Sequence, residues 1–201
     1  MERVYSELKA QITAGTYPPG TRLEASQLAK SLDASTTPVR DALNRLAGER
    51  LVESWHQEGF RQPLLVEADL HALYIWTAML IGVALKGRTP LSDQPAGLFD
   101  LPSFKEYPEA VESLFRTIAK GSLNRELQHA LLSAIDRSQA FRAAEARVDS
   151  SLRVKLAAME EDYRFGRWTA LRSKITSFHR RRIMQAGRVA TQLRSRTEPL
   201  R

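Results

Sequence analysis

The sequence predicts a mainly α-helical protein with two parts, an N-terminal winged helix-turn-helix of three helices and a small β-hairpin, followed by an all-α helical bundle. Between residues 20 and 60, short segments with apolar side chains at helical spacing precede two strand-like segments around a glycine-containing turn. After residue 66 the spacing is helical, apart from one Gly- and Pro-rich stretch. A chain of 201 residues can hold two compact domains, which we place at residues 1–66 and 67–201.

Two short amphipathic helices separated by a tight turn define the first domain. Asp33 and Ala34 interrupt the helical spacing at this turn. Ser35 or Thr37 can cap the second helix, and Pro38 fits its first turn, where a missing N–H costs nothing. The apolar faces are Leu23, Leu28, Ala29 and Leu32 in the first helix and Val39, Leu43, Leu46 and Ala47 in the second.

The polar face of the second short helix is typical of a helix that reads DNA. Arg can bond bidentately to guanine, Asn to adenine, and Thr can offer its hydroxyl or methyl group. Strands expected at residues 51–55 and 60–64, joined by a turn at 56–59, would form a wing beside this helix. A solvated face of a small helical domain explains the same polar residues, and chemistry alone leaves both interpretations open. The candidate DNA-contacting residues are Arg22, Ser35, Thr36, Thr37, Pro38, Arg40, Asn44, Arg45, His56, Gln57 and Gly59.

Several motifs in this region occur in the order and at the spacing of a known family. They are Ile12 with Gly15, and the runs 19–23, 27–29 and 35–43. With these motifs, about the first third of the chain resembles the winged-helix domain of the GntR family of bacterial transcription regulators. The remainder resembles the all-helical effector domain of the FadR-like subfamily in helix pattern and length.

This resemblance implies a homodimeric regulator that binds a pseudo-palindromic operator in double-stranded DNA. It further implies a repressor that is released by a small-molecule effector of unknown identity. Arg40 matches the family's DNA-contacting Arg and is our main candidate for base readout. Two positions depart from the family pattern, because Thr36 stands where Arg is common and Arg50 where Gly is usual. The missing Arg predicts an operator different from the family's usual sequence.

The second domain is predicted to contain five helices. The first is apolar on more than one face and is expected to be central, and Gly- and Pro-containing residues 87–102 follow it as the longest loop. The helices are expected at about residues 69–86, 107–120, 124–137, 142–165 and 168–194, with residues 197–201 as a frayed tail.

Many relatives hold a metal in this domain through one Asp and three His, but the aligned positions here lack such ligands. They fall near Val111, Phe115 and Leu156, and only His179 lies close to a family His. Closed metal sites need about four ligands, so we expect no metal and no cofactor.

A small-molecule pocket, if present, is predicted to be lined by apolar and aromatic groups. The subfamily's Arg and Glu in the first helix of this domain are replaced near Thr77 and Ile81. This pattern favours a ligand less charged than the carboxylates typical of metal-bearing relatives. An ordinary aromatic core, or a domain kept only for dimerisation, are alternatives that stay open. The candidate effector-binding residues are Tyr74, Trp76, Phe115, Arg116 and His179.

The formal net charge of +7 suits a polyanionic partner, but its location does not support the winged helix. Residues 1–66 hold eight basic and eight acidic residues, whereas residues 172–201 hold nine basic residues and only Glu198. An alternative function is therefore a non-specific, architectural nucleic-acid-binding protein that uses the run 180–182 and Arg188. A solvated helix face explains the same arginines.

Other classes of protein are disfavoured. The chain has no Cys, no G-x-S-x-G motif and no glycine-rich phosphate loop, and the carboxylates at 160–162 point in different directions on a helix, so we expect no enzyme. No apolar run approaches the ~20 residues of a membrane span, and no signal peptide is evident. We expect a cytoplasmic protein.

Overall fold

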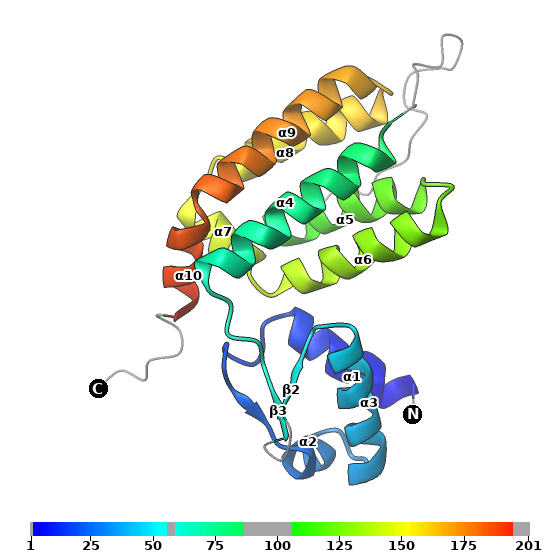
Figure 1. Cartoon of the computed structure of the whole chain (residues 1–201), viewed down its shortest axis with the longest axis vertical. Helices are drawn as coiled ribbons and strands as arrows, with labels where there is room; N and C mark the ends of the chain where they lie inside the picture. Colours follow the sequence, from blue (N-terminus) through cyan, green and yellow to red (C-terminus); the bar gives the residue numbers. More distant parts are fainter. Residues whose placement is uncertain (1, 56–58, 87–105, 195–201) are drawn as a thin grey trace.

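A computed structural model describes residues 2–55, 59–86 and 106–194 (Figure 1). The N-terminal part combines three helices with a small antiparallel sheet of strand order β1-β3-β2. Its core is one apolar cluster that includes Leu8, Ile12, Val39, Leu43 and Leu46. The elements are α1 (Glu2–Thr13), β1 (Arg22–Leu23), α2 (Ala25–Ser31), α3 (Thr36–Gly48), β2 (Glu53–Trp55) and β3 (Gly59–Arg61).

The wing has three strands, so the two-stranded hairpin predicted from the sequence was incomplete. Leu23, which we had assigned to the first short helix, lies in β1 opposite Phe60 of β3. Its apolar side chain still faces the core because alternate residues of a strand point to one side. The helix before the turn is therefore only the seven residues of α2.

Helix α3 begins at the predicted cap position, but the predicted capping hydrogen bond is not formed. Ser35 is the N-cap residue in an extended conformation, yet its side chain makes no capping hydrogen bond. In the turn before it, Asp33 has a φ of 45°. Beyond the C-terminus of α3, Arg50 has a φ of 61°, in the left-handed region that favours glycine. Arg50, at the position where the resemblance leads us to expect Gly, thus adopts a glycine-like conformation.

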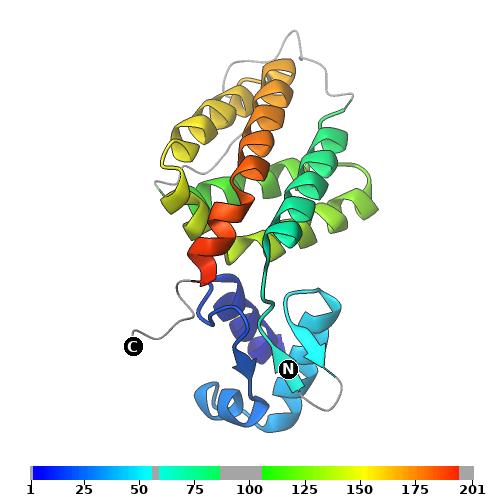
Figure 2. The same ribbon diagram turned by 60° about the vertical axis from the view of Figure 1, so that its left-hand side comes forward.

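Seven helices form the rest of the described chain and pack above the winged part (Figure 2). Their core is a second, separate apolar cluster, in which α4 packs against α6 and α9. They are α4 (Glu67–Ala84), α5 (Tyr107–Lys120), α6 (Arg125–Gln139), α7 (Arg142–Val148), α8 (Leu152–Arg164), α9 (Trp168–Met184) and α10 (Ala186–Arg194). The predicted loop at 87–102 and the tail at 197–201 lie outside the described residues.

Two of the predicted helices were wrong as single elements. The segment 142–165 is divided into α7 and α8, and the segment 168–194 into α9 and α10. Asp149 lies at the first break, where its carboxylate accepts hydrogen bonds from the backbone N–H and the hydroxyl of Ser151, at 3.0 and 2.6 Å. Its second oxygen accepts from Gln185 Nε2 at the other break, at 3.1 Å. These polar contacts between the two breaks explain why each predicted helix is divided. The spacing of apolar residues could not predict them.

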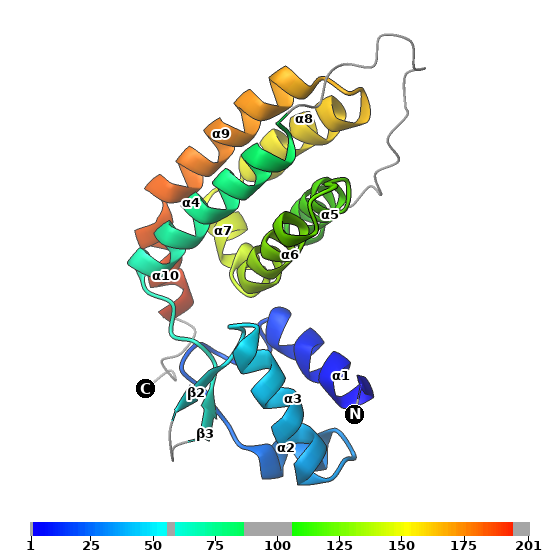
Figure 3. The same cartoon turned by 45° about the vertical axis from the view of Figure 1, so that its right-hand side comes forward.

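The two parts meet where α1 lies under α6 (Figure 3). Gly15, just after α1, has a φ of 70°, and a Cβ there would lie 3.3 Å from the carbonyl oxygen of Ala140. A glycine therefore permits both the turn and the close approach. Within the described residues, no helix has the length and apolar character required to cross a membrane.

Candidate nucleic-acid interface

The predicted DNA-contacting face is a shallow concavity between α3 and the wing. It has a volume of about 480 Å³ and lies between the start of α2, the first turns of α3 and strands β2 and β3. Its polar lining residues include Arg22, Ser26, Thr36, Arg40 and Ser54. The fold thus brings two of the predicted α3 residues together with Arg22 and the wing.

Of the two exposed arginines of α3, Arg40 is the one available to bind an external partner. Its guanidinium makes no ion pair with any residue that the structure describes. Arg22, at the other side of the concavity, pairs with Glu24 at 2.5 Å. Since Arg40 is solvent-exposed and projects from the helix whose opposite face is buried, it can contact a ligand without breaking an internal bond.

The remaining α3 candidates occupy different surroundings. Ser35, Thr36, Thr37 and Asn44 are exposed, and Pro38 is half-buried. These exposed groups can donate and accept hydrogen bonds along the same helix as Arg40.

Arg45 is directed toward α1 rather than toward the wing. Its guanidinium lies 3.6 Å from the centroid of the Tyr5 ring, and it pairs with Glu2 at 3.1 Å and with Glu49 at 3.6 Å. Stacking over an aromatic face and two carboxylate partners hold this side chain within the domain. The geometry fits a residue that ties α3 to α1.

The wing contributes an aromatic side chain that sequence reasoning did not single out. Trp55 is 51% exposed at the end of β2, lines the concavity and lies 5.7 Å from the guanidinium of Arg61. Its only signal in the sequence was a large aromatic residue before a polar turn. Gly59 has a φ of 88°, and the predicted wing residues His56 and Gln57 lie outside the described residues.

Three of the five effector candidates meet in the core of the helical part. The His179 ring stacks on Phe115 with ring centroids 5.6 Å apart, and Tyr74 is buried nearby on α4. Burial, together with the charges of Arg182 and Arg142, holds the pKa of His179 well below its usual value. The imidazole is therefore neutral.

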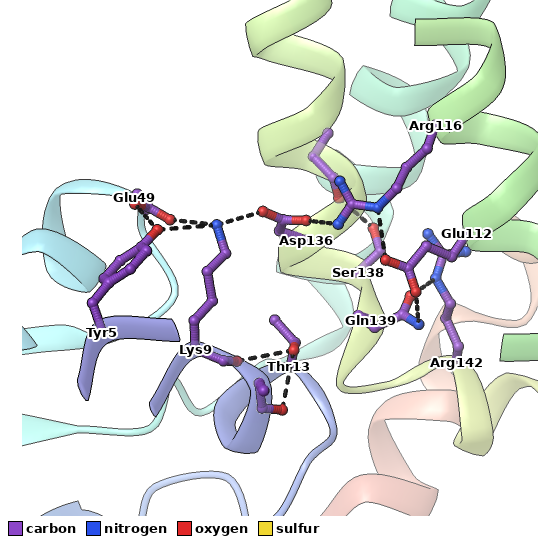
Figure 4. A network of polar contacts seen from close by, with 12 residues as sticks. Tyr5, Lys9, Thr13, Glu49, Glu112, Arg116, Asp136, Ser138, Gln139 and Arg142 are labelled. Carbon is purple, nitrogen blue, oxygen red and sulfur yellow. Dashed lines mark hydrogen bonds and ion pairs between the residues drawn. The ribbon is translucent and has the colours of Figure 1, made fainter. Parts of the chain in front are cut away.

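The other two candidates lie elsewhere. Trp76 is 45% exposed on the outer side of α4. Arg116 pairs with Glu112 at 2.7 Å and with Asp136, on the side facing the winged part (Figure 4).

The structure places charged side chains beside His179, which the sequence did not predict, and the apolar effector pocket stays a prediction. Arg182 and Glu145 are both buried and form an ion pair at 2.7 Å, and Arg142 is completely buried close to them. Arg182 therefore does not belong to a solvated face. Periodicity could not reveal these groups, since charged residues at buried helix positions look like ordinary surface residues in sequence.

The positions aligned with the metal ligands of relatives are apolar and buried. Val111, Phe115 and Leu156 are fully enclosed in the helical core. The described residues contain no group of three or more His, Asp or Glu side chains able to hold a metal ion. The absence of a bound metal stays a prediction.

Residues 1–61 match the model of the family described as bacterial regulatory proteins, gntR family, and thus form a GntR-family domain. The chain is 36% identical over 70 residues to the uncharacterised HTH-type transcriptional regulator YdhC of Bacillus subtilis, covering 35% of this chain and 31% of that protein. It is 28% identical over 127 residues to the HTH-type transcriptional regulator McbR of Escherichia coli, covering 61% and 52% of the two chains. The chain therefore spans about a third to a half of the length of these relatives.

Two solved structures share the fold over almost the whole chain. A crystal structure described as a transcriptional regulator GntR from Rhodococcus sp. RHA1 has a TM-score of 0.74 at 17% identity and covers 92% of this chain and 96% of that one. The structure of E. coli McbR/YncC has a TM-score of 0.64 at 19% identity, with coverage of 93% and 96%. The predicted combination of winged helix-turn-helix and helical domain is confirmed, and the matched family and relatives are transcription regulators, not enzymes.

Proposed function

We propose, from the GntR-family domain formed by residues 1–61, that this protein is a sequence-specific DNA-binding transcription regulator. The observation that carries the proposal is Arg40, an exposed cation on α3 that forms no ion pair with the described residues and lines the concavity beside the wing. In this arrangement α3 enters the major groove and Arg40 reads a guanine, with Thr36 and Asn44 as further contacts.

The other predicted residues fall into three roles in this proposal. Ser35, Thr37 and Pro38 bring the start of α3 to the phosphate backbone, and Arg22 exchanges Glu24 for a phosphate. His56, Gln57 and Gly59 stay candidates for contacts with the neighbouring groove. Arg45 positions α3 against α1 and does not touch the DNA.

We further propose that two copies act together, because a single winged helix reads only a few base pairs. A twofold dimer places two α3 helices in successive major grooves, ~34–36 Å apart or a multiple of that distance. The helical part offers an apolar surface for this contact, where Ile75 and Met79 of α4 line a groove against α9 and are 39% and 58% exposed. Such a dimer recognises a pseudo-palindromic operator.

The regulatory direction that we favour is repression released by a small molecule bound in the helical domain. The ligand would favour a dimer whose α3 helices no longer match the two half-sites, a population shift that needs only a difference in ligand affinity between two arrangements. In this proposal the protein acts in the cytoplasm.

Selection of bound duplexes from a random library tests the DNA-binding function. We expect a twofold-symmetric sequence that the dimer binds at least 10³-fold more tightly than unrelated DNA at one fixed salt concentration. Equal affinity for the selected and unrelated duplexes would contradict sequence-specific regulation.

The same assay separates the architectural alternative. In the Arg-rich segment of α9, Arg182 is buried and Arg181 pairs with Asp149, which leaves Arg180 exposed. We expect Arg180→Ala combined with Arg188→Ala to leave the affinity for the selected sequence unchanged. A uniform loss of binding to all duplexes in this variant would favour the alternative.

A further inference from the structure

A cleft lies at the junction of the winged and helical parts, outside the helical core, with a volume of about 290 Å³. Residues at the end of α3 and just after it line the cleft, together with residues of α4 and α6 and the connecting segment 62–65. Its apolar lining comes from both parts and includes Ile12, Leu64 and Leu73. Pockets for small organic ligands measure roughly 300–1,000 Å³, so this cleft has room for a molecule of a few carbon atoms.

Two arginines from different parts line this cleft. Arg50 follows α3 and is exposed, and Arg137, near the end of α6, is half-buried. Neither guanidinium makes a hydrogen bond or an ion pair with any residue that the structure describes. Burial lowers the pKa of Arg137, and repulsion from Arg50 lowers it further, by more than the attraction to Asp69 raises it. Two like charges at one cavity favour an anionic ligand that touches both.

Arg50 carries its side chain at a backbone position that disfavours one. Its φ of 61° lies in the left-handed region, where glycine is the least strained residue. Strained residues of this kind cluster at sites where the side chain has a function. Contact with a ligand in the cleft accounts for an arginine at a position where the resemblance leads us to expect glycine.

A buried amide supplies a further polar feature of the cleft. Gln62 lines the cleft and is only 7% exposed, and its Oε1 atom makes no hydrogen bond with the described residues. Buried acceptors are normally paired. This one can accept only from an O–H or N–H group, which an ionised carboxylate does not have. A ligand that satisfies the cleft therefore needs a donor as well as an anionic group.

The carboxylates that line the cleft do not neutralise its two arginines. Asp136 pairs with Lys9 at 2.7 Å and with Arg116 (Figure 4). Asp69 accepts at 3.0 Å from the backbone N–H of the N-cap residue of α4, and Glu53 is exposed on β2. None of the three forms an ion pair with either arginine of the cleft, so both guanidinium groups are available to a ligand.

We propose that the cleft binds a small organic acid that carries a hydroxyl or amino group beside its carboxylate and a short aliphatic chain. The carboxylate lies between Arg50 and Arg137, whose guanidinium groups donate charge-assisted hydrogen bonds. The hydroxyl or amine donates to Gln62, and the chain lies against the apolar lining. Since the two arginines belong to different parts, one bound molecule links the end of α3 to α6. The site is independent of the proposed DNA binding.

Thermal unfolding of the full chain tests the site with three probes of one carbon skeleton. Leucine and leucate carry an amine and a hydroxyl beside the carboxylate, and isocaproate carries neither. At about 10 mM, compared with chloride at equal ionic strength, leucine or leucate should raise the Tm by about 2–4 °C and isocaproate by less than half as much. Whichever of the two acts distinguishes an amino acid from a hydroxy acid. No shift with either, or an equal shift with isocaproate, would overturn the proposal.

Variants from both parts locate the binding at the junction. Arg50→Gly and Arg137→Met should each abolish the shift, measured from the variant's own Tm, and Arg50→Gly also relieves the strained backbone. Gln62→Met should reduce the shift to that of isocaproate. Arg125→Met, at an exposed position of α6, is the matched control and should keep the full shift. A shift that persists in Arg50→Gly or Arg137→Met would place the ligand elsewhere and overturn the site, whatever the outcome of the DNA selection.

Discussion

Because His179 is buried and neutral, we expect the free energy of unfolding to fall as the pH is lowered. Its imidazole is buried on α9 beside two arginines, and the burial and these charges hold its pKa well below 6.5 in the folded protein. In the unfolded chain the ring titrates near 6.5. Below pH 6.5 the imidazole becomes protonated in the unfolded chain but stays neutral in the folded protein. The contribution of the neutral His179 ring to the free energy of unfolding is therefore complete above pH 6.5 and is lost as the pH falls.

The size of this loss follows from the unfolded pKa. Each pH unit below 6.5 costs about 1.4 kcal/mol, which amounts to about 2 kcal/mol between pH 7.5 and 5.0 while the folded ring stays neutral. His179→Gln removes the titrating ring but keeps an acceptor for Arg182. We therefore expect the variant to lose about 2 kcal/mol less stability than the wild type over this interval.

Urea unfolding at both pH values, in phosphate-free buffers of equal ionic strength, measures the difference. His71→Gln, at an exposed position of α4, is the matched control and should follow the wild type. If His179→Gln loses as much stability on acidification as the wild type, the buried neutral imidazole is refuted.

Three further outcomes are expected. Arg50→Gly should raise the free energy of unfolding by about 0.5–1 kcal/mol in urea unfolding, because Arg50 has a φ of 61° and a side chain there is strained; a decrease would contradict this. Met79→Glu, which places a charge on the exposed apolar face of α4, should shift a micromolar dimer to monomer in sedimentation, whereas Val154→Glu on α8 should not; a wild type that sediments as a monomer would refute the dimer. Purified protein should carry less than stoichiometric Zn, Ni or Mn, and chelators should leave its Tm and DNA binding unchanged; about one tightly held metal per chain would refute the metal-free core.

The winged helix could be predicted from the sequence because its signals are local. Apolar spacing, the turn at Asp33 and the cap position at Ser35 fall within one short stretch. The strand β1 was missed because its two residues give no periodicity, and it forms only by pairing with β3 about forty residues later.

The helical part shows what periodicity cannot reveal. The breaks near Asp149 and Gln185 depend on polar contacts between segments distant in sequence. Likewise, Arg142 and Arg182 are buried only because α7 and α9 pack together with α5 around Glu145, an arrangement that composition cannot indicate. The DNA-contacting residues stay a prediction, as does the division at residue 66.

The affinity of Arg40→Ala for the selected duplex tests the central claim most directly. Arg40 is exposed and makes no internal ion pair in the described part of the chain, so the variant should fold and melt like the wild type. Loss of a bidentate base contact predicts about 1–3 kcal/mol weaker binding to the selected sequence, with a smaller change for unrelated DNA. Lys30→Ala, which removes an exposed charge from α2, is the control for a purely electrostatic effect. Equal affinity of Arg40→Ala and the wild type for the selected duplex would contradict DNA reading by this face of α3.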